Sequence, residues 1–218
     1  MGPGGVTAAS PPSPGMPRSF GTPGHPGRRR ELGRKVIHIS SLAFPLFVWL
    51  VPRPTALLGL GLAVAVAVLI DTLRLRVRSF ARLFYSLTRD LLRGRERRGF
   101  VGATWMMVAY FLAVLIFPTP VAVAAMAYNA LGDASAALVG RRFGRVRLLG
   151  GKTLEGAMAC VVACFLVGVV VPGIPLHIAL IGALAASALE LGSLPPDDNL
   201  WMTLGGGAVL WLALVTLM

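Results

Sequence analysis

The chain has 218 residues, of which 56% are apolar and only 14% are charged, and its mean hydropathy is +0.74. This composition is far more apolar than that of an ordinary soluble domain and argues against a soluble enzyme. The net charge of +12 would suggest a nucleic-acid ligand in a soluble protein. Here, however, the basic residues lie between apolar segments, where they can meet lipid headgroups or phosphates. We therefore expect an integral membrane protein that does not bind nucleic acid.

The first segment, residues 1–27, is rich in Pro, Gly and Ser and has no apolar run, so it resembles neither a signal peptide nor a helix. We expect a disordered cytoplasmic tail, followed by a polytopic membrane catalytic domain over residues 28–218. A membrane-spanning helix needs about 20 mostly apolar residues. The sequence predicts an all-α protein with about seven such spans, at 36–52, 54–71, 101–117, 120–140, 155–172, 175–193 and 200–218.

The connections between these spans alternate in character. Three are short and contain proline, at 51–54, 118–120 and 172–175, as expected for tight turns. All 21 basic residues except Arg53 lie before the first span or in the other connections. Because cytoplasmic loops carry an excess of Lys and Arg, we place the N-terminus in the cytoplasm and the C-terminus outside. All nine acidic residues also fall at or near this inner face, which suggests a polar site there.

Asp133 is the most informative acidic residue, because it lies inside an otherwise apolar span together with Asn129. An ionisable group in that position costs at least ~2.5 kcal/mol on insertion scales and usually marks a functional site. The alternative is an Asp that packs between helices and pairs with an Arg.

The following loop contains Gly150-Gly151-Lys152-Thr153. It is not a P-loop, because Val146 stands where that motif requires its first glycine. Glycine still permits close approach of the backbone to phosphate, and Lys152 with Arg141 and Arg142 would supply positive charge to a triphosphate. An ordinary basic cytoplasmic loop is the competing interpretation.

A second polar cluster lies between the last two spans and contains Glu190, Asp197, Asp198 and Asn199. Carboxylate and amide oxygens suit Mg²⁺, which typically takes one or two carboxylates plus substrate phosphates. A simple turn, with Asn199 as the cap of the last helix, is the alternative.

Two smaller groups of polar residues lie at the same inner face. Lys35 and His38 are three residues apart at the start of the first span and so share a helix face. A single His near a membrane interface is more often structural than catalytic. Asp71 and Arg74, also three apart, are expected to form an ion pair.

Taken together and in this order, these elements resemble the CTP-dependent polyprenol kinase family, which includes dolichol kinases, phytol kinases and CTP-using diacylglycerol kinases. The similarity runs from Glu31 to about Asn199. The residues that carry it are Glu31, Arg34, Lys35 and His38; Gly132, Asp133, Ala136, Gly140 and Gly144; Gly151 to Gly156; and Asp197 to Asn199. The middle element is also similar to phosphatidate cytidylyltransferases, whose usual Asp-Arg-x-Asp-Ser ending is replaced here by Pro-Pro-Asp-Asp-Asn.

The resemblance implies CTP and Mg²⁺ acting on a lipid alcohol whose hydroxyl lies at the cytosolic face of the cytoplasmic membrane. Asp133 and Asp198 would bind Mg²⁺ with support from Asp197 and Asn199, and Lys152 would hold the β- and γ-phosphates. Glu155 or Asp198 would accept the hydroxyl proton. The remaining nucleotide-binding candidates are Lys35, His38, Asn129, Arg141, Arg142, Gly150, Gly151, Thr153 and Gly156. A cytidylyltransferase and a transporter with a buried charged path remain the alternatives, and the sequence indicates no particular oligomeric state.

Overall fold

The computed structural model describes residues 36, 38–88, 92, 94–97, 99–192 and 194–218, so the predicted tail and Lys35 lie outside the described residues. The regular structure within these ranges is helical, apart from one isolated β-bridge between Arg147 and Thr153. The principal helices are α2 (Ala43–Leu50), α3 (Arg53–Arg76), α4 (Arg78–Thr88), α5 (Gly102–Ile116), α6 (Thr119–Ala127), α7 (Asp133–Phe143), α8 (Leu154–Val170), α9 (Leu176–Gly192) and α10 (Asp198–Leu217).

Each predicted span contains a helix, which confirms the all-helical fold. Three helices are long and apolar enough to cross a membrane: Arg53–Arg76, Thr119–Phe143 and Asp198–Leu217. Shorter apolar helices, at His38–Leu50, Gly102–Ile116, Leu154–Val170 and Leu176–Gly192, occupy the other four predicted spans. The chain is therefore an all-helical, multi-pass membrane protein. Seven crossings with the N-terminus inside remain a prediction.

Proline and glycine set the boundaries at the predicted short turns. α3 begins directly after Pro52 and α6 directly after Pro118, and each helix has a proline in its first turn. Proline suits this position because its missing N–H would have no partner inside the helix there. The turn between α8 and α9 contains Gly173, whose φ of +87° is strained for residues with a side chain.

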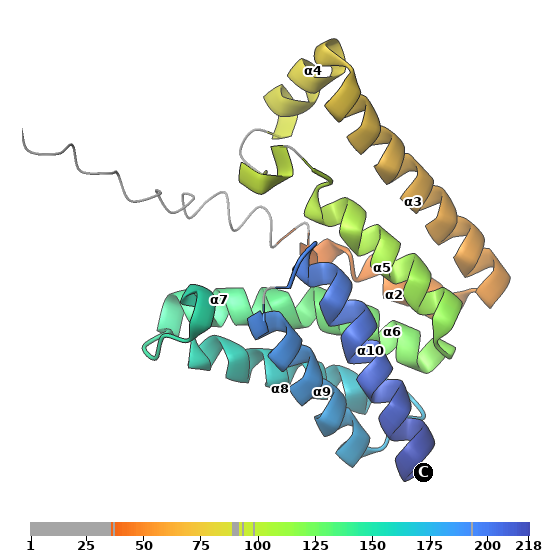
Figure 1. The fold of residues 1–218 in the computed structure, drawn as a ribbon. Coiled ribbons are helices and arrows are strands. Elements are labelled where there is room, and N and C mark those ends of the chain that lie inside the picture. The colour runs from red at the N-terminus through yellow and green to blue at the C-terminus, as the bar shows by residue number, and fades with distance from the viewer. Residues whose placement is uncertain (1–35, 37, 89–91, 93, 98, 193) are drawn as a thin grey trace, which may run out of the picture.

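The helix Thr119–Phe143 lies at the centre of the fold. In its apolar window 72% of the residues are buried within the protein, compared with 17% for α3 and 33% for α10. In Figure 1 this helix, formed by α6 and α7, crosses behind α10 and has α8 and α9 beneath it. A helix that is apolar and buried on most sides is a core helix. The polar groups it carries are therefore held by protein on several sides.

A π-helical turn, Tyr128–Gly132, joins α6 to α7. One extra residue per turn changes which way the side chains of α7 point relative to those of α6, and such turns often occur at functional sites. The neighbouring helices pack closely here, because a Cβ on Gly132 would lie 2.5 Å from Met202 Cε and 2.7 Å from Cys164 Sγ. The turn thus brings α7, α8 and α10 together just before Asp133.

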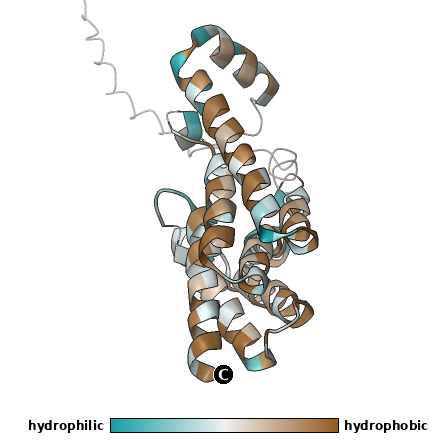
Figure 2. Cartoon of the chain, turned by 90° about the vertical axis from the view of Figure 1, so that its right-hand side faces the viewer, coloured by the Kyte–Doolittle hydropathy of each residue, from teal (hydrophilic) through white to brown (hydrophobic). Residues whose placement is uncertain are grey.

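Lipid acts as the solvent for the outer helix faces. Leu58 and Leu62, four residues apart on α3, are 76% and 68% exposed, and Met158 and Val162 on α8 are similarly open. Figure 2 shows hydrophobic colour along the helices and hydrophilic colour chiefly near their ends, notably at α4. Helix α4 lies in a connection that we predicted only as a basic loop, so the sequence analysis missed it.

We expect Gly168→Ala to destabilise the protein, because its Cβ would lie 2.7 Å from Ala179 Cβ on the adjoining helix α9. Gly61→Ala is the matched control, since its Cβ would meet only the Phe111 ring at 3.5 Å. Thermal unfolding in detergent should show a lower Tm for Gly168→Ala alone, corresponding to roughly 1–3 kcal/mol. Equal melting temperatures for both variants would contradict this packing.

Candidate functional site

The polar side chains lie where α3 and α9 end, where α5, α8 and α10 begin, and at Asp133, the first residue of α7. Apart from Asp133, these positions are the helix ends opposite the three short proline turns, and the sequence predicts them to be cytosolic. The arrangement divides into three groups of contacts: one around Asp133, one in the loop before α8, and one at the start of α10.

The first group joins the start of the helix His38–Leu50 to the π-helical turn. His38 Nε2 lies 3.0 Å from the backbone oxygen of Asn129 and 3.4 Å from Asp133 Oδ2. A carbonyl oxygen can only accept, so Nε2 carries the hydrogen and donates it. Asn129 is fully buried, and neither polar atom of its amide has a hydrogen-bond partner among the described residues. The structure thus brings together three predicted site residues, two of them 91 positions or more from His38 in sequence.

The second group is the glycine loop between α7 and α8. Its two sides are joined by backbone hydrogen bonds from the Leu148 nitrogen to the Lys152 oxygen (2.8 Å) and from the Leu154 nitrogen to the Val146 oxygen (3.0 Å). Gly150 and Gly151 lie at its tip with φ of +67° and +79°, a region that favours glycine. A Cβ on either residue would have no neighbour within 4 Å. The backbone at the tip is therefore open to approach by a ligand.

Glu155 fixes the base of this loop. Its Oε1 accepts hydrogen bonds from the backbone nitrogens of Arg145 (3.0 Å) and Val146 (3.2 Å). Its Oε2 has no hydrogen-bond partner in the described part of the chain. Arg141 and Arg142, which we predicted to contact the nucleotide, lie in the last turn of α7 next to the loop and are exposed.

Thr153 and Gly156 have clear structural roles at the start of α8. Thr153 caps the helix, since its Oγ1 accepts a hydrogen bond from the Gly156 nitrogen at 3.2 Å. A Cβ on Gly156 would lie 2.7 Å from the Ala136 oxygen, and one on Gly140 would lie 2.7 Å from Thr153 Oγ1. These motif glycines therefore let α7 and α8 approach closely. Their predicted contact with nucleotide remains a prediction.

Lys152 connects the loop to the end of α9. Its Nζ lies 2.9 Å from Glu190 Oε1 and also donates to the Glu190 backbone oxygen. The sequence places Glu190 in one cluster with the carboxylates at the start of α10, but the structure pairs it with Lys152. The two residues are 38 positions apart, and no sequence spacing signals the contact.

At the start of α10 the cap is Asp197, and not Asn199 as the alternative interpretation of this cluster would have it. Asp197 Oδ1 accepts from the Asn199 nitrogen at 3.1 Å and from Asn199 Nδ2 at 2.6 Å. Asn199 Nδ2 also donates to the Gly102 oxygen at 3.2 Å, which ties α10 to α5. The Gly102 nitrogen in turn donates to Glu96 Oε1 at 3.2 Å, a buried carboxylate that the sequence analysis did not select.

The predicted ion pair of Asp71 and Arg74 is confirmed and is almost completely buried. Arg74 donates two hydrogen bonds to Asp71 Oδ1, at 2.6 and 2.9 Å, and others to the backbone oxygens of Glu96 (2.8 Å) and Gly99 (2.7 Å). Asp71 Oδ2 accepts from Thr104 Oγ1 at 2.7 Å. This Asp71–Arg74 clamp holds the segment that leads into α5, and through Gly102 it supports the start of α10.

The carboxylate side chains of this site could hold Mg²⁺ only if most ligands of the ion came from outside the protein. Among the described residues, no three His, Cys, Asp or Glu side chains lie close enough to hold a metal ion by themselves. Asp133 and Asp198 nevertheless lie on helices that meet, because Met202, one turn after Asp198, reaches Gly132. One or two carboxylates are sufficient where substrate phosphates complete the coordination of Mg²⁺.

Comparison with curated proteins gives related sequences over most of the chain. It is 31% identical to the phytol kinase of Synechocystis over an alignment of 200 residues. This alignment covers 83% of this chain and 78% of that protein. It is 30% identical over 147 residues to CTP-dependent diacylglycerol kinase 1 of Eremothecium gossypii, but spans only 45% of that protein. An uncharacterized protein of Rickettsia prowazekii is 29% identical over 183 residues, or 78% of this chain and 88% of that protein. No protein-family model and no solved structure matches.

These similarities define the chain as a relative of membrane lipid kinases. It belongs to the CTP-dependent polyprenol kinase family, which confirms the resemblance seen in the sequence motifs.

We expect Asp71→Ala to destabilise the protein strongly, because it leaves the buried guanidinium of Arg74 without its charged partner. Loss of one partner from a buried pair typically costs about 3–5 kcal/mol. The exposed neighbour Thr72→Ala is the control on the same helix. Thermal unfolding should separate the two variants clearly, and a Tm near that of the unmodified protein for Asp71→Ala would show that the clamp does not support the fold.

Proposed function

We propose that this protein transfers the γ-phosphate of CTP to the hydroxyl of a long-chain isoprenoid alcohol or diacylglycerol, in a Mg²⁺-dependent reaction at the cytosolic face. The observation that carries the proposal is the cluster of His38, Asn129 and Asp133, held at the π-helical turn of the central helix. Two relatives, named phytol kinase and CTP-dependent diacylglycerol kinase 1, support the same reaction class.

Phosphoryl transfer depends mainly on positioning the reactants and neutralising charge, so each side of the site must supply one of these functions. Lys152 would bind β- or γ-phosphate oxygens, with Arg142 and the open backbone at Gly150 and Gly151 beside it. Lys152 contacts Glu190, and this contact directs the ammonium group toward the end of α9. The loop therefore has a cation in place and a backbone free for phosphate.

Asp133 and Asp198 would hold Mg²⁺, and the ion would neutralise negative charge on the triphosphate. Asp197 would act mainly by capping α10 and fixing Asn199, and so would orient the first turn of that helix. His38, by its contacts with Asn129 and Asp133, would hold the carboxylate of Asp133 in place.

The acceptor alcohol would reach the site from the bilayer, with its hydroxyl at the helix ends and its apolar tail along the exposed faces. Glu155 or Asp198 would take the hydroxyl proton. Glu155 uses Oε1 to hold the loop, and its Oε2 has no hydrogen-bond partner among the described residues.

The nucleotide and lipid substrates are tested in a turnover assay that combines each of CTP, ATP, GTP and UTP with each of a polyprenol, phytol and diacylglycerol. We expect a phosphorylated lipid with CTP, and Asp133→Asn should lower kcat by about 100-fold or more, because it removes the charge proposed to bind Mg²⁺. Arg76→Gln, an exposed substitution at the end of α3, is the control and should retain activity. Absence of any phosphorylated lipid with all four nucleotides would refute the kinase.

We expect Lys152→Ala to lower kcat/KM for CTP by about 10- to 100-fold, since one charge-assisted hydrogen bond to phosphate is lost. The control is Arg145→Gln, which removes an exposed positive charge from the same loop. Initial rates measured over a range of CTP concentrations distinguish the two. If both variants weaken CTP equally, the loop contributes only general positive charge and the assigned role of Lys152 fails.

A further inference from the structure

Helix α4 presents two different rows of side chains to its surroundings. None of its 11 residues is buried, and the exposed ones repeat at intervals of four, so they lie above one another along the helix. The arginine row consists of Arg78, Arg82 and Ser86, and the neighbouring leucine row consists of Ser79, Leu83 and Leu87. The two leucines are 58% and 75% exposed. The outer half of α4 therefore changes from cationic to apolar across its width.

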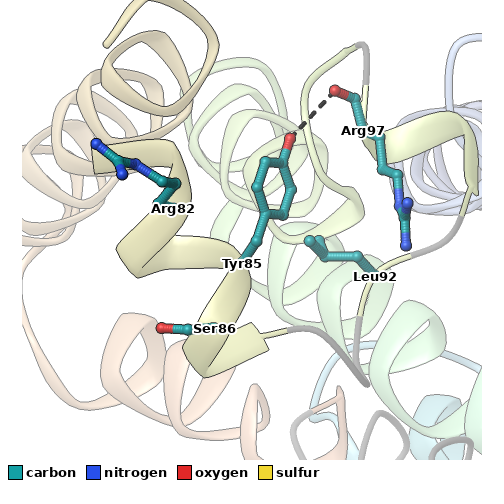
Figure 3. A pocket seen from close by; sticks show the side chains of 5 residues that line it. All are labelled: Arg82, Tyr85, Ser86, Leu92 and Arg97. Atoms are coloured by element: carbon teal, nitrogen blue, oxygen red, sulfur yellow. Dashed lines mark hydrogen bonds between the residues drawn. The ribbon is translucent and has the colours of Figure 1, made fainter. Parts of the chain in front are cut away.

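The other half of α4 faces the protein. The rings of Phe84 and Tyr85 lie with their centroids 5.3 and 6.0 Å from the guanidinium carbon of Arg74. The Tyr85 hydroxyl accepts a hydrogen bond from Arg74 at 3.2 Å and donates one to the Arg97 backbone oxygen at 3.2 Å. Figure 3 shows Arg82 on a different side of α4 from Tyr85, which points toward Arg97. These contacts fix the rotation of α4 about its own axis, so that the arginine and leucine rows face outward.

The place of α4 in the chain puts both rows at a membrane surface. Helix α3 has 24 residues and is long and apolar enough to cross a membrane. Val77, in an extended conformation, ends α3, and α4 begins at the next residue. Figure 1 shows that the chain turns away from the axis of α3 at this point. A helix that follows a membrane span so closely begins at the level of the lipid headgroups.

The charge of this region indicates which surface α4 suits. From residue 72 to residue 88 the sequence contains four arginines and no acidic residue. The clamp uses Arg74, whereas Arg76, Arg78 and Arg82 are exposed. The cytoplasmic leaflet offers anionic headgroups beside an apolar acyl layer, and the sequence predicts this end of α3 to be cytoplasmic. A helix with adjacent basic and apolar sides matches that boundary.

We propose that α4 lies along the surface of the cytoplasmic leaflet, with its leucine row among the acyl chains and its arginine row against the phosphates of anionic phospholipids. Because the inner side of α4 contacts Arg74, this position also holds the Asp71–Arg74 clamp at the depth of the headgroups. The phospholipids bind to this surface and are not the phosphoryl acceptor, so the proposal goes beyond the proposed function and does not depend on it.

Nitroxide spin labels on the full chain in proteoliposomes test the position of α4. Labels are attached to Leu87→Cys in the leucine row and to Ser86→Cys, its neighbour in the arginine row. The two native cysteines are buried, and the unmodified protein gives the background. The vesicles contain phosphatidylcholine with about 30% phosphatidylglycerol. We expect the ratio of collisions with oxygen to collisions with a water-soluble nickel chelate to be at least about threefold higher at position 87 than at position 86.

The role of the arginine row is tested by omitting phosphatidylglycerol, which should lower the ratio at position 87 by about twofold. Arg78→Gln/Arg82→Gln should abolish this dependence on anionic lipid. The matched control is Arg145→Gln/Arg147→Gln, which removes the same charge from exposed residues of the loop before α8 and should keep the dependence. None of these measurements requires catalysis.

Four results would overturn the proposal. Equal ratios at positions 86 and 87 would place the leucine row in water. A label at position 87 that is shielded from both reagents would place protein, such as a second copy of this chain, against that row. A ratio that does not depend on phosphatidylglycerol, or a dependence that Arg78→Gln/Arg82→Gln and its control lose equally, would show that the arginine row does not recognise anionic lipid.

Discussion

The central helix Thr119–Phe143 has to be packed on several sides by other helices while it carries polar residues that lipid cannot solvate. Its first half satisfies this requirement with small residues, so α2, α8 and α10 can approach its backbone. The π-helical turn then changes the register of the helix, and Asn129 and Asp133 meet His38 from the first span. A polar group inside a membrane protein must find partners within the protein itself. The position of the candidate site follows from where this helix can supply them.

Two further sets of contacts support the site from outside the central helix. The glycines of α7 and α8 permit a close contact that holds the loop carrying Lys152, and Glu155 fixes the base of that loop. The Asp71–Arg74 clamp joins α3, the segment after α4 and the start of α5, and Gly102 extends this support to Asn199. The first set of contacts holds the loop, and the second holds the start of α10.

Apolar run length and proline position were sufficient to predict every apolar helix, because both are local properties of the sequence. Helix α4 escaped prediction, because its arginines were interpreted as a loop and its four-residue periodicity was not weighed. Asp133 could be selected because a charge in an apolar span is conspicuous. The pairing of Lys152 with Glu190, and the role of Glu96 beside Gly102, depend on contacts between distant segments that no spacing in the sequence encodes.

The middle sequence element resembles both the kinases of this family and the cytidylyltransferases, and these two classes of enzyme attack different phosphorus atoms of the nucleotide. The most direct measurement is therefore a turnover experiment with CTP labelled separately at the α- and γ-phosphorus, in the presence of Mg²⁺ and both a lipid alcohol and phosphatidic acid. The account predicts that lipid acquires label from the γ-position only, with CDP as the other product. Label from the α-position on phosphatidic acid, with release of pyrophosphate, would contradict it.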